Sequence, residues 1–200
     1  MKKLYAGILS VSLMFFSINA LGEAPSQTEI SEWRREGEKG NPVAAYNLGL
    51  MYAKGDGVRQ NYFEALKWYR IAADKGDISA QFNLGMLYRE GQGVRQNFTE
   101  AARIFKGIAE KGFPEAQNEL GMMYEKGQGV HQDYDEALKY YRMSAAKKYA
   151  KAQYNLGSAY ESGRGTRQDM KEAKEWYGKA CDNGLQQGCD AYRRLNESGH

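Results

Sequence analysis

The sequence predicts an all-α solenoid made of helix-turn-helix repeats. The first observation is a Leu-Gly pair that recurs every 36 residues without drift. The second is a helical spacing of apolar residues within each period, and the third is a set of turn and capping residues between the helices. A fixed period of this length is typical of stacked repeat proteins. The pairs are Leu48-Gly49, Leu84-Gly85, Leu120-Gly121 and Leu156-Gly157.

The first helix of each unit is predicted from apolar or small residues three and four positions apart. In the first unit these are Ala45, Leu48, Gly49 and Tyr52, which share one helical face. A Gly-x-Gly turn follows, beginning at Gly55. Glycine tolerates the positive φ that a helix C-cap needs, so the turn ends the helix.

The second helix of each unit is predicted from an Asn or Asp followed three residues later by Glu. The first residue can cap the helix through its side-chain oxygen, and the Glu can reach back to the cap. The helix then buries Ala65, Tyr69 and Ala72 or their equivalents. The capping pairs are Asn61/Glu64, Asn97/Glu100, Asp133/Glu136 and Asp169/Glu172.

These patterns define the expected domain organisation. Four full repeats occupy residues 41–76, 77–112, 113–148 and 149–184, with capping helices at 23–40 and 185–200. The small residues Gly49 and Ala65 let the helices of one hairpin approach closely, while Tyr52 and Tyr69 fill the space between successive hairpins. Neighbouring units thus bury what one unit cannot bury alone.

The N-terminus has the pattern of a secretory signal. Two lysines precede an uncharged apolar run from Leu4 to Ile18, and small residues follow it. The run is shorter than the ~20 residues of a spanning helix. We expect cleavage after Gly22 and a periplasmic or secreted protein; an N-terminal membrane anchor is the alternative.

The charge of the mature chain argues against polyanionic partners. Without Lys2 and Lys3 it carries 26 Lys and Arg against 25 Asp and Glu, interspersed along the sequence. Proteins that bind phosphate backbones carry a basic patch or stripe. We therefore expect no nucleic-acid partner, and no stable membrane insertion after signal cleavage.

Several motifs resemble those of the Sel-one-like repeat family. They are Ala-Gln-Tyr-Asn-Leu-Gly at 152–157, the Tyr160 that stands four residues after Leu156, and the Gly-x-Gly-Val-x-Gln turns at 55–60, 91–96 and 127–132. The resemblance covers residues 41 to about 195 and implies a right-handed superhelix related to tetratricopeptide arrays. It also implies adaptor work: scaffolding, export-linked regulation, host interaction or neutralisation of a toxic effector. The fourth turn departs from the pattern with Thr166 in place of Val.

The two cysteines, Cys181 and Cys189, fall at the end of one predicted helix and the start of the next. In an exported protein this placement predicts a disulfide, worth about 2.6 kcal/mol by loop entropy. A redox or metal pair is the alternative, but the spacing is wrong and no His is near. The pair also resembles the cysteine-rich, penicillin-binding branch of the family, whose repeats each carry one.

The enzyme interpretation has one candidate nucleophile motif, Ser144-Ala145-Ala146-Lys147. A serine β-lactamase also needs Ser-Asp-Asn and Lys-Thr-Gly elements, which the chain lacks. Ser144 moreover stands in the register of buried Ala72. His131 and His200 are the only histidines and cannot build a triad or a metal site. We expect no enzyme activity, no metal and no cofactor.

The binding surface is predicted on the concave face, where the first helices project the side chains that they do not pack. Aromatic residues and methionines there suit an adaptable protein-binding groove, flanked by charges. The opposite interpretation, in which Tyr46 and its equivalents pack against the neighbouring helix, stays open. The predicted partner-binding residues are Tyr46, Leu50, Phe82, Met86, Arg89, Asn118, Met122, Glu125 and Tyr154.

The sequence therefore favours a monomeric, exported scaffold that binds a protein or peptide as an adaptor, regulator or effector-neutralising inhibitor. The alternatives are a weak β-lactamase or cell-wall-peptide enzyme, and a small-peptide sensor that controls a signalling partner.

Overall fold

A computed structural model describes residues 24–199. The expected signal peptide and its cleavage point lie outside these residues. The described part contains ten α-helices and no strand. They are α1 (Gln27–Glu38), α2 (Pro42–Lys54), α3 (Tyr62–Asp74), α4 (Ile78–Glu90), α5 (Phe98–Glu110), α6 (Pro114–Lys126), α7 (Tyr134–Ala146), α8 (Ala150–Ser162), α9 (Met170–Asp182) and α10 (Gln186–Glu197).

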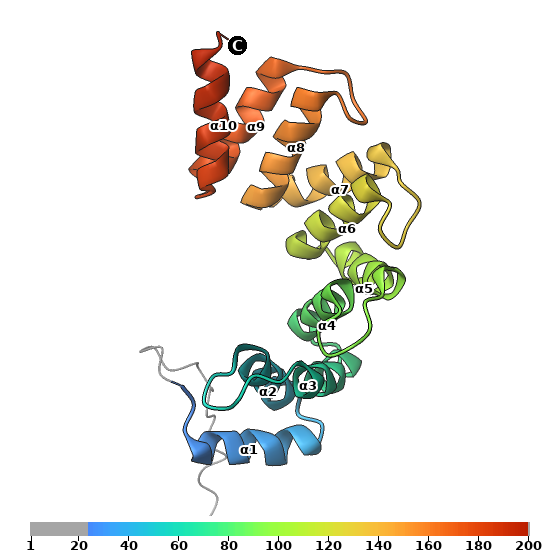
Figure 1. Ribbon diagram of the computed structural model, residues 1–200, viewed down its shortest axis with the longest axis vertical. Helices are drawn as coiled ribbons and strands as arrows, with labels where there is room; N and C mark the ends of the chain where they lie inside the picture. Colours follow the sequence, from blue (N-terminus) through green and yellow to red (C-terminus); the bar gives the residue numbers. More distant parts are fainter. Residues whose placement is uncertain (1–23, 200) are drawn as a thin grey trace, which may run out of the picture.

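The helices form hairpins that stack into a curved solenoid, as predicted (Figure 1). Helices α2 and α3 form the first hairpin, and α4/α5, α6/α7 and α8/α9 form the next three. Each helix packs mainly against the helices that precede and follow it in the chain. Helix α1 covers one end of the stack and α10 covers the other (Figure 1).

The predicted turn and capping residues set the helix ends. Asn61 and Asp133 each accept hydrogen bonds from two main-chain amides of the first turn. Asn97 and Asp169 each accept one such bond. The C-caps of α2, α4, α6 and α8 are glycines in the left-handed conformation: Gly55, Gly91, Gly127 and Gly163.

The glutamates three residues after these caps behave differently from the prediction. A reciprocal capping box forms at Ser26 and Glu29 of α1. Glu100 instead forms an ion pair with Arg103, and Glu136 pairs with Lys139. A basic residue one turn along the helix offers the carboxylate a charged donor, which competes with the more distant main-chain amide.

Within each hairpin the aromatic residue of the second helix lies on the glycine of the first. A Cβ added to Gly49 would lie 2.4 Å from the Tyr69 ring. Tyr69 is 2% exposed, so the ring has no room to move. The contact explains why each Leu-Gly pair carries glycine, and it places the large ring inside its own hairpin as well as beside the next one.

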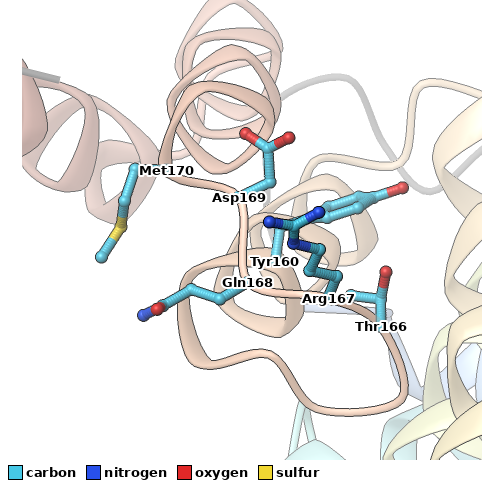
Figure 2. Close-up of a pocket in the computed structure, with 6 residues that line it drawn as sticks. All are labelled: Tyr160, Thr166, Arg167, Gln168, Asp169 and Met170. Atoms are coloured by element: carbon cyan, nitrogen blue, oxygen red, sulfur yellow. The ribbon is translucent and has the colours of Figure 1, made fainter.

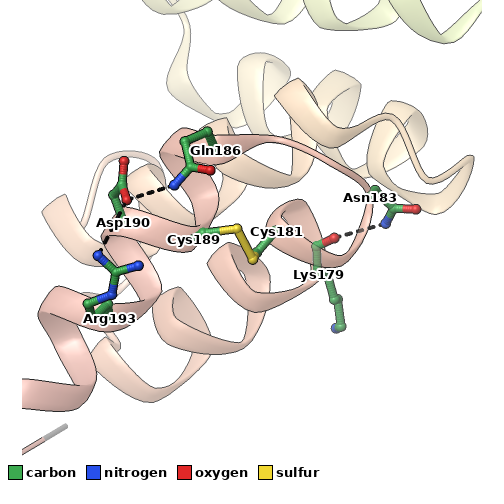
Figure 3. The surroundings of a disulfide bond; sticks show 7 residues. All are labelled: Lys179, Cys181, Asn183, Gln186, Cys189, Asp190 and Arg193. Carbon is green, nitrogen blue, oxygen red and sulfur yellow. Dashed lines mark hydrogen bonds and ion pairs between the residues drawn. A yellow bond between two sulfur atoms is a disulfide. The ribbon is translucent and has the colours of Figure 1, made fainter.

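The predicted disulfide between Cys181 and Cys189 is present and joins the end of α9 to the start of α10 (Figure 3). The two Cα atoms lie 4.5 Å apart. The bond fastens the last helix to the last hairpin. Among residues 24–199, no helix has the length and apolar character needed to cross a membrane.

Candidate functional site: the concave face

The predicted binding residues lie on α2, α4, α6 and α8, the first helices of the four hairpins. In Figure 1 the middle of the stack bows to one side, and α4 and α6 lie nearer the inside of this bend than α5 and α7. We use the term groove face for the outward-facing positions of these first helices, represented by Val43, Tyr46 and Leu50 and their equivalents every 36 residues.

The N-terminal half of the groove face is apolar. Tyr46, Leu50, Phe82 and Met86 are all half-buried, and Val43 beside them is 54% exposed. In α2 no charged residue occurs before Lys54, the last residue of the helix. The surface of α2 before Lys54 therefore contains no charged group that a partner would have to desolvate.

The aromatic residues of this half also pack against the core. The ring centroids of Tyr46 and Tyr69 lie 6.0 Å apart, and Phe82 lies 5.6 Å from both Phe105 and Phe113. Each ring therefore contacts the core on one side and stays partly exposed to solvent on the other, and its role in partner binding remains a prediction. Core contact fixes the ring orientation, which lowers the entropy lost when a partner binds.

Asn118 is a correction, because it is not exposed as the helical register predicted. It is 1% exposed, and its side-chain oxygen accepts a hydrogen bond from Asn155 Nδ2 at 2.9 Å. An amide with a polar partner on the next hairpin can be buried there, whereas an aromatic ring at this position would project into the groove. The aromatic column resumes at Tyr154, 5.2 Å from Tyr177.

Arg89 takes part in an ion pair that sequence reasoning missed. It binds Glu119 on the next hairpin and Glu90 on its own helix. Glu119 is 8% exposed, and burial raises the pKa of its carboxyl group while Arg89 opposes this rise. The available signal was the register: Glu119 stands where the other three hairpins carry Asn.

Glu125 has two partners within the protein. Its carboxylate accepts a hydrogen bond from the Tyr141 hydroxyl at 2.6 Å and pairs with Arg164 at 2.9 Å. Burial and the carboxylate together raise the pKa of Tyr141. Glu161 has the equivalent partners Tyr177 and Arg194. The charged groups of the C-terminal half thus tie successive hairpins together.

The remaining predicted residue, Met122, is half-buried and packs against the core formed by α7 and α8, which includes Leu138 and Leu156. Met86 and Met122 occupy equivalent positions of the repeat, so two successive hairpins carry a flexible thioether side chain there.

The Ser-x-x-Lys motif lies in the packed interior, as its register predicted. Ser144 is fully buried, and its hydroxyl donates a hydrogen bond to the Pro114 carbonyl at 2.7 Å. Lys147 donates to the carbonyl of Gly112. The hydroxyl therefore points at a main-chain acceptor rather than at Lys147. In residues 24–199 no three His, Cys, Asp or Glu side chains are grouped to hold a metal ion.

A hollow lies at the turn between α8 and α9 (Figure 2). Its volume is about 450 Å³, and Arg167 and Tyr160 flank it together with Thr166, Gln168, Asp169 and Met170. Its position coincides with two departures from the repeat, since the first unit has Val58 and Tyr62 where this unit has Thr166 and Met170. Smaller or more flexible side chains leave the space open.

The stacked hairpins define an all-α solenoid of tandem helical repeats. Four consecutive segments match the Sel1 repeat, at residues 42–77, 78–113, 114–149 and 150–185. The chain belongs to the Sel1 repeat family, which confirms the resemblance seen in the sequence. Repeats of this family usually mediate protein–protein interactions.

Solved structures of repeat proteins are similar over most of the chain. The c5321 protein, a protective antigen of uropathogenic Escherichia coli with an SLR fold, is 35% identical over 80% of this chain and 34% of its own, with a TM-score of 0.75. A Sel1 repeat protein from Oxalobacter formigenes is 34% identical over 82% of this chain and 65% of its own, with a TM-score of 0.78. The chain thus spans about a third of the first and under two thirds of the second.

The immunity protein Pa5087 from Pseudomonas aeruginosa shares the fold, at 24% identity over 80% of this chain and 59% of its own, with a TM-score of 0.53. No curated protein sequence matches the chain.

Proposed function

We propose that this protein is an exported scaffold that binds a protein or peptide partner on its groove face. Export is supported by the disulfide, because such bonds persist in oxidising compartments. It is also supported by the N-terminal sequence pattern. A binding role is supported by the family, whose repeats usually mediate protein interactions.

The observation that carries the proposal is the apolar surface across α2 and α4. Val43 is 54% exposed, and Tyr46 and Phe82 beside it are held by core rings behind them. Rigid aromatic anchors with flexible methionine neighbours are typical of protein-binding surfaces. The polar residues toward the C-terminal half supply the rim of such a surface.

Binding to such a partner could serve three roles: adaptor, regulator or effector-neutralising inhibitor. One protein of the same fold is named an immunity protein, and its likeness to this chain shows the fold alone. We expect a gene for a secreted toxin beside this one if the inhibitor role holds.

The experiment is affinity purification with cross-linking from the native envelope, using the wild type and matched surface variants. The triple variant Tyr46→Ala, Phe82→Ala, Met86→Ala should lose the partner while helical circular dichroism is unchanged. Because Tyr46 and Phe82 also touch the core, Val43→Glu provides a test without core contacts. Phe63→Ser is the control, since Phe63 is 74% exposed at the start of α3, outside the groove face.

Retention of the same partner by Val43→Glu, with loss in Phe63→Ser, would move the binding surface off the groove face. Hydrolysis of a chromogenic cephalosporin by the purified protein, abolished by Ser144→Ala, would favour the enzyme instead.

A further inference from the structure

Helix α5 contains a glycine that packing does not require. A Cβ built on Gly107 would find nothing within 4 Å. The residue lies inside the helix, where glycine lowers stability relative to alanine. The same register position holds Ile71 in the first unit and Met143 in the third. The second unit alone among the four therefore lacks a side chain here.

Because Gly107 has no side chain, a hollow of about 260 Å³ remains between α3 and α5, and α4 also contributes to its lining. Its apolar lining includes Leu84, Ile104 and Ile108, and its polar lining includes Asp74, Arg103 and Lys111. Whole drug-sized ligands occupy pockets of about 300–1,000 Å³, so this one suits a single bulky side chain. It uses a different face of α4 from Phe82 and Met86.

Lys111 also departs from the repeat. Its equivalents reach back over the preceding hairpin: Lys147 donates to the Gly112 carbonyl, and Lys75 lies beside Gly40. Lys111 instead lines the hollow. Gly76 stands one repeat before Gly112, and no side chain lies near a Cβ built on Gly76, so Lys111 does not reach back to it. Within residues 24–199 the main-chain N–H of Lys111 caps α5 by donating to the Ala109 carbonyl, while its side chain forms no hydrogen bond or ion pair.

The other two charged residues at the rim of the hollow are Arg103 and Asp74, and neither offers an unpaired positive charge. Arg103 is held by Glu100 through two hydrogen bonds of 2.6 and 2.8 Å. Asp74 ends α3 on the opposite side of the hollow. A carboxylate entering the site is therefore directed toward Lys111 and away from Asp74.

We propose that this hollow binds the C-terminal residue of a peptide, with a bulky apolar side chain over Gly107 and the α-carboxylate on Lys111 Nζ. In a C-terminal residue the side chain and the α-carboxylate are bonded to the same Cα, so the side chain can enter the hollow while the carboxylate reaches Lys111 Nζ. Within an extended peptide, by contrast, the side chain of an acidic residue next to the bulky residue would point to the opposite side of the peptide from the hollow. The single unpaired ammonium beside a one-side-chain hollow fits the terminal arrangement.

The test is titration of the full chain, labelled for methyl and amide NMR, with N-acetyl-phenylalanine and with its amide. We expect saturable shifts at Leu84, Ile104 and Ile108, with the acid binding about fivefold more tightly than the amide, as for an exposed ion pair. Lys111→Gln should remove this preference. Lys75→Gln is the matched control and should keep it.

Gly107→Met, which installs the residue of the third unit, should fill the hollow and abolish the shifts. Because packing leaves room there, its melting temperature should not fall, and Gly107→Ala serves as a milder second variant. Equal affinity of acid and amide for the wild type, or no saturable shift at these residues, would overturn the proposal. Val43→Glu should leave this binding unchanged, so its outcome is separate from that of the groove face.

Discussion

Gln153 donates a side-chain hydrogen bond to the main-chain carbonyl of Ala145 at 3.4 Å, and one repeat later Cys189 and Cys181 occupy these two positions. The equivalent amide bonds are Gln81 to Ala73 at 3.1 Å and Gln117 to Ala109 at 3.0 Å. The disulfide therefore takes the place of a hydrogen bond that links each hairpin to the next helix. It does so at the junction between α9 and α10.

Removal of the disulfide should destabilise the last hairpin and α10. Cys181→Ala with Cys189→Ala should lower the free energy of unfolding by about 2.6 kcal/mol, the loop-entropy estimate. Cys181→Ala with Cys189→Gln installs the amide of the other junctions and should regain about 1 kcal/mol. Urea denaturation with and without reductant measures both. Equal stability of wild type and double alanine variant would contradict a stapling role.

Alanine at Gly49 should destabilise the first hairpin, because its Cβ would lie 2.4 Å from a buried ring. Overpacking of a core costs about 1–3 kcal/mol, which exceeds the gain of roughly 0.5–1 kcal/mol from replacing a helical glycine. Gly107→Ala is the control and should show that gain, since nothing lies near its Cβ. Chemical denaturation compares the two; a stabilised Gly49→Ala protein would be inconsistent with the contact.

Loss of one hydroxyl should show how strongly the Glu125 carboxylate joins α6 to α7 within the third hairpin. Tyr141→Phe removes the hydrogen bond to Glu125 and should cost about 1.5–3 kcal/mol, as expected for a bond to a charged group. Tyr88→Phe removes a bond from exposed Arg70 and should cost under about 1 kcal/mol. The comparison uses urea midpoints at neutral pH. Costs in the reverse order would contradict a stabilising role for the bond between Tyr141 and Glu125.

The buried pair of Arg89 and Glu119 predicts a pH dependence. Burial already raises the pKa of Glu119, and Arg89→Gln should raise it further because the opposing charge is lost. Stability tied to a raised pKa is present below the ordinary value of 4.5 and is lost as the pH rises through the raised one. The variant should therefore be about 1–3 kcal/mol less stable than wild type at pH 7, with a smaller gap at pH 4.

Arg103→Gln is the matched control for this pH dependence. Arg103 lowers the pKa of Glu100, so the pair's small contribution is present at neutral pH and is lost as the pH falls. As an exposed pair it should change stability by less than about 1 kcal/mol. An Arg89→Gln deficit that is the same at pH 4 and pH 7 would exclude Glu119 as its source.

Local chemistry made most of the fold predictable. Helix ends follow from single residues, such as Asn61 at the start of α3 and Gly55 at the end of α2. The buried positions Ala65, Tyr69 and Ala72 follow from helical spacing. The disulfide was predictable too, because the repeat register places its two cysteines on adjacent helices.

The burial and contacts of the groove face were less predictable, because several of its side chains contact residues on other hairpins. Asn118 lies at a position whose equivalents carry aromatic rings, and only the nearby Asn155 explains its burial. Glu119 is buried because Arg89 reaches it from the preceding hairpin. Helical spacing gives the direction of a side chain from its own axis, but it does not identify the group that meets it.

Within residues 24–199 each helix packs mainly against its neighbours in the chain, so this part of the protein has no central core on which distant segments converge. Its architecture is modular in the evolutionary sense: duplication or deletion of one 36-residue unit keeps the helix-turn-helix packing and changes the length of the arc. The reach of the curved wall toward larger or smaller ligands can thus be altered by whole-unit steps, provided that the contacts specific to neighbouring hairpins, such as Arg89 with Glu119, are kept.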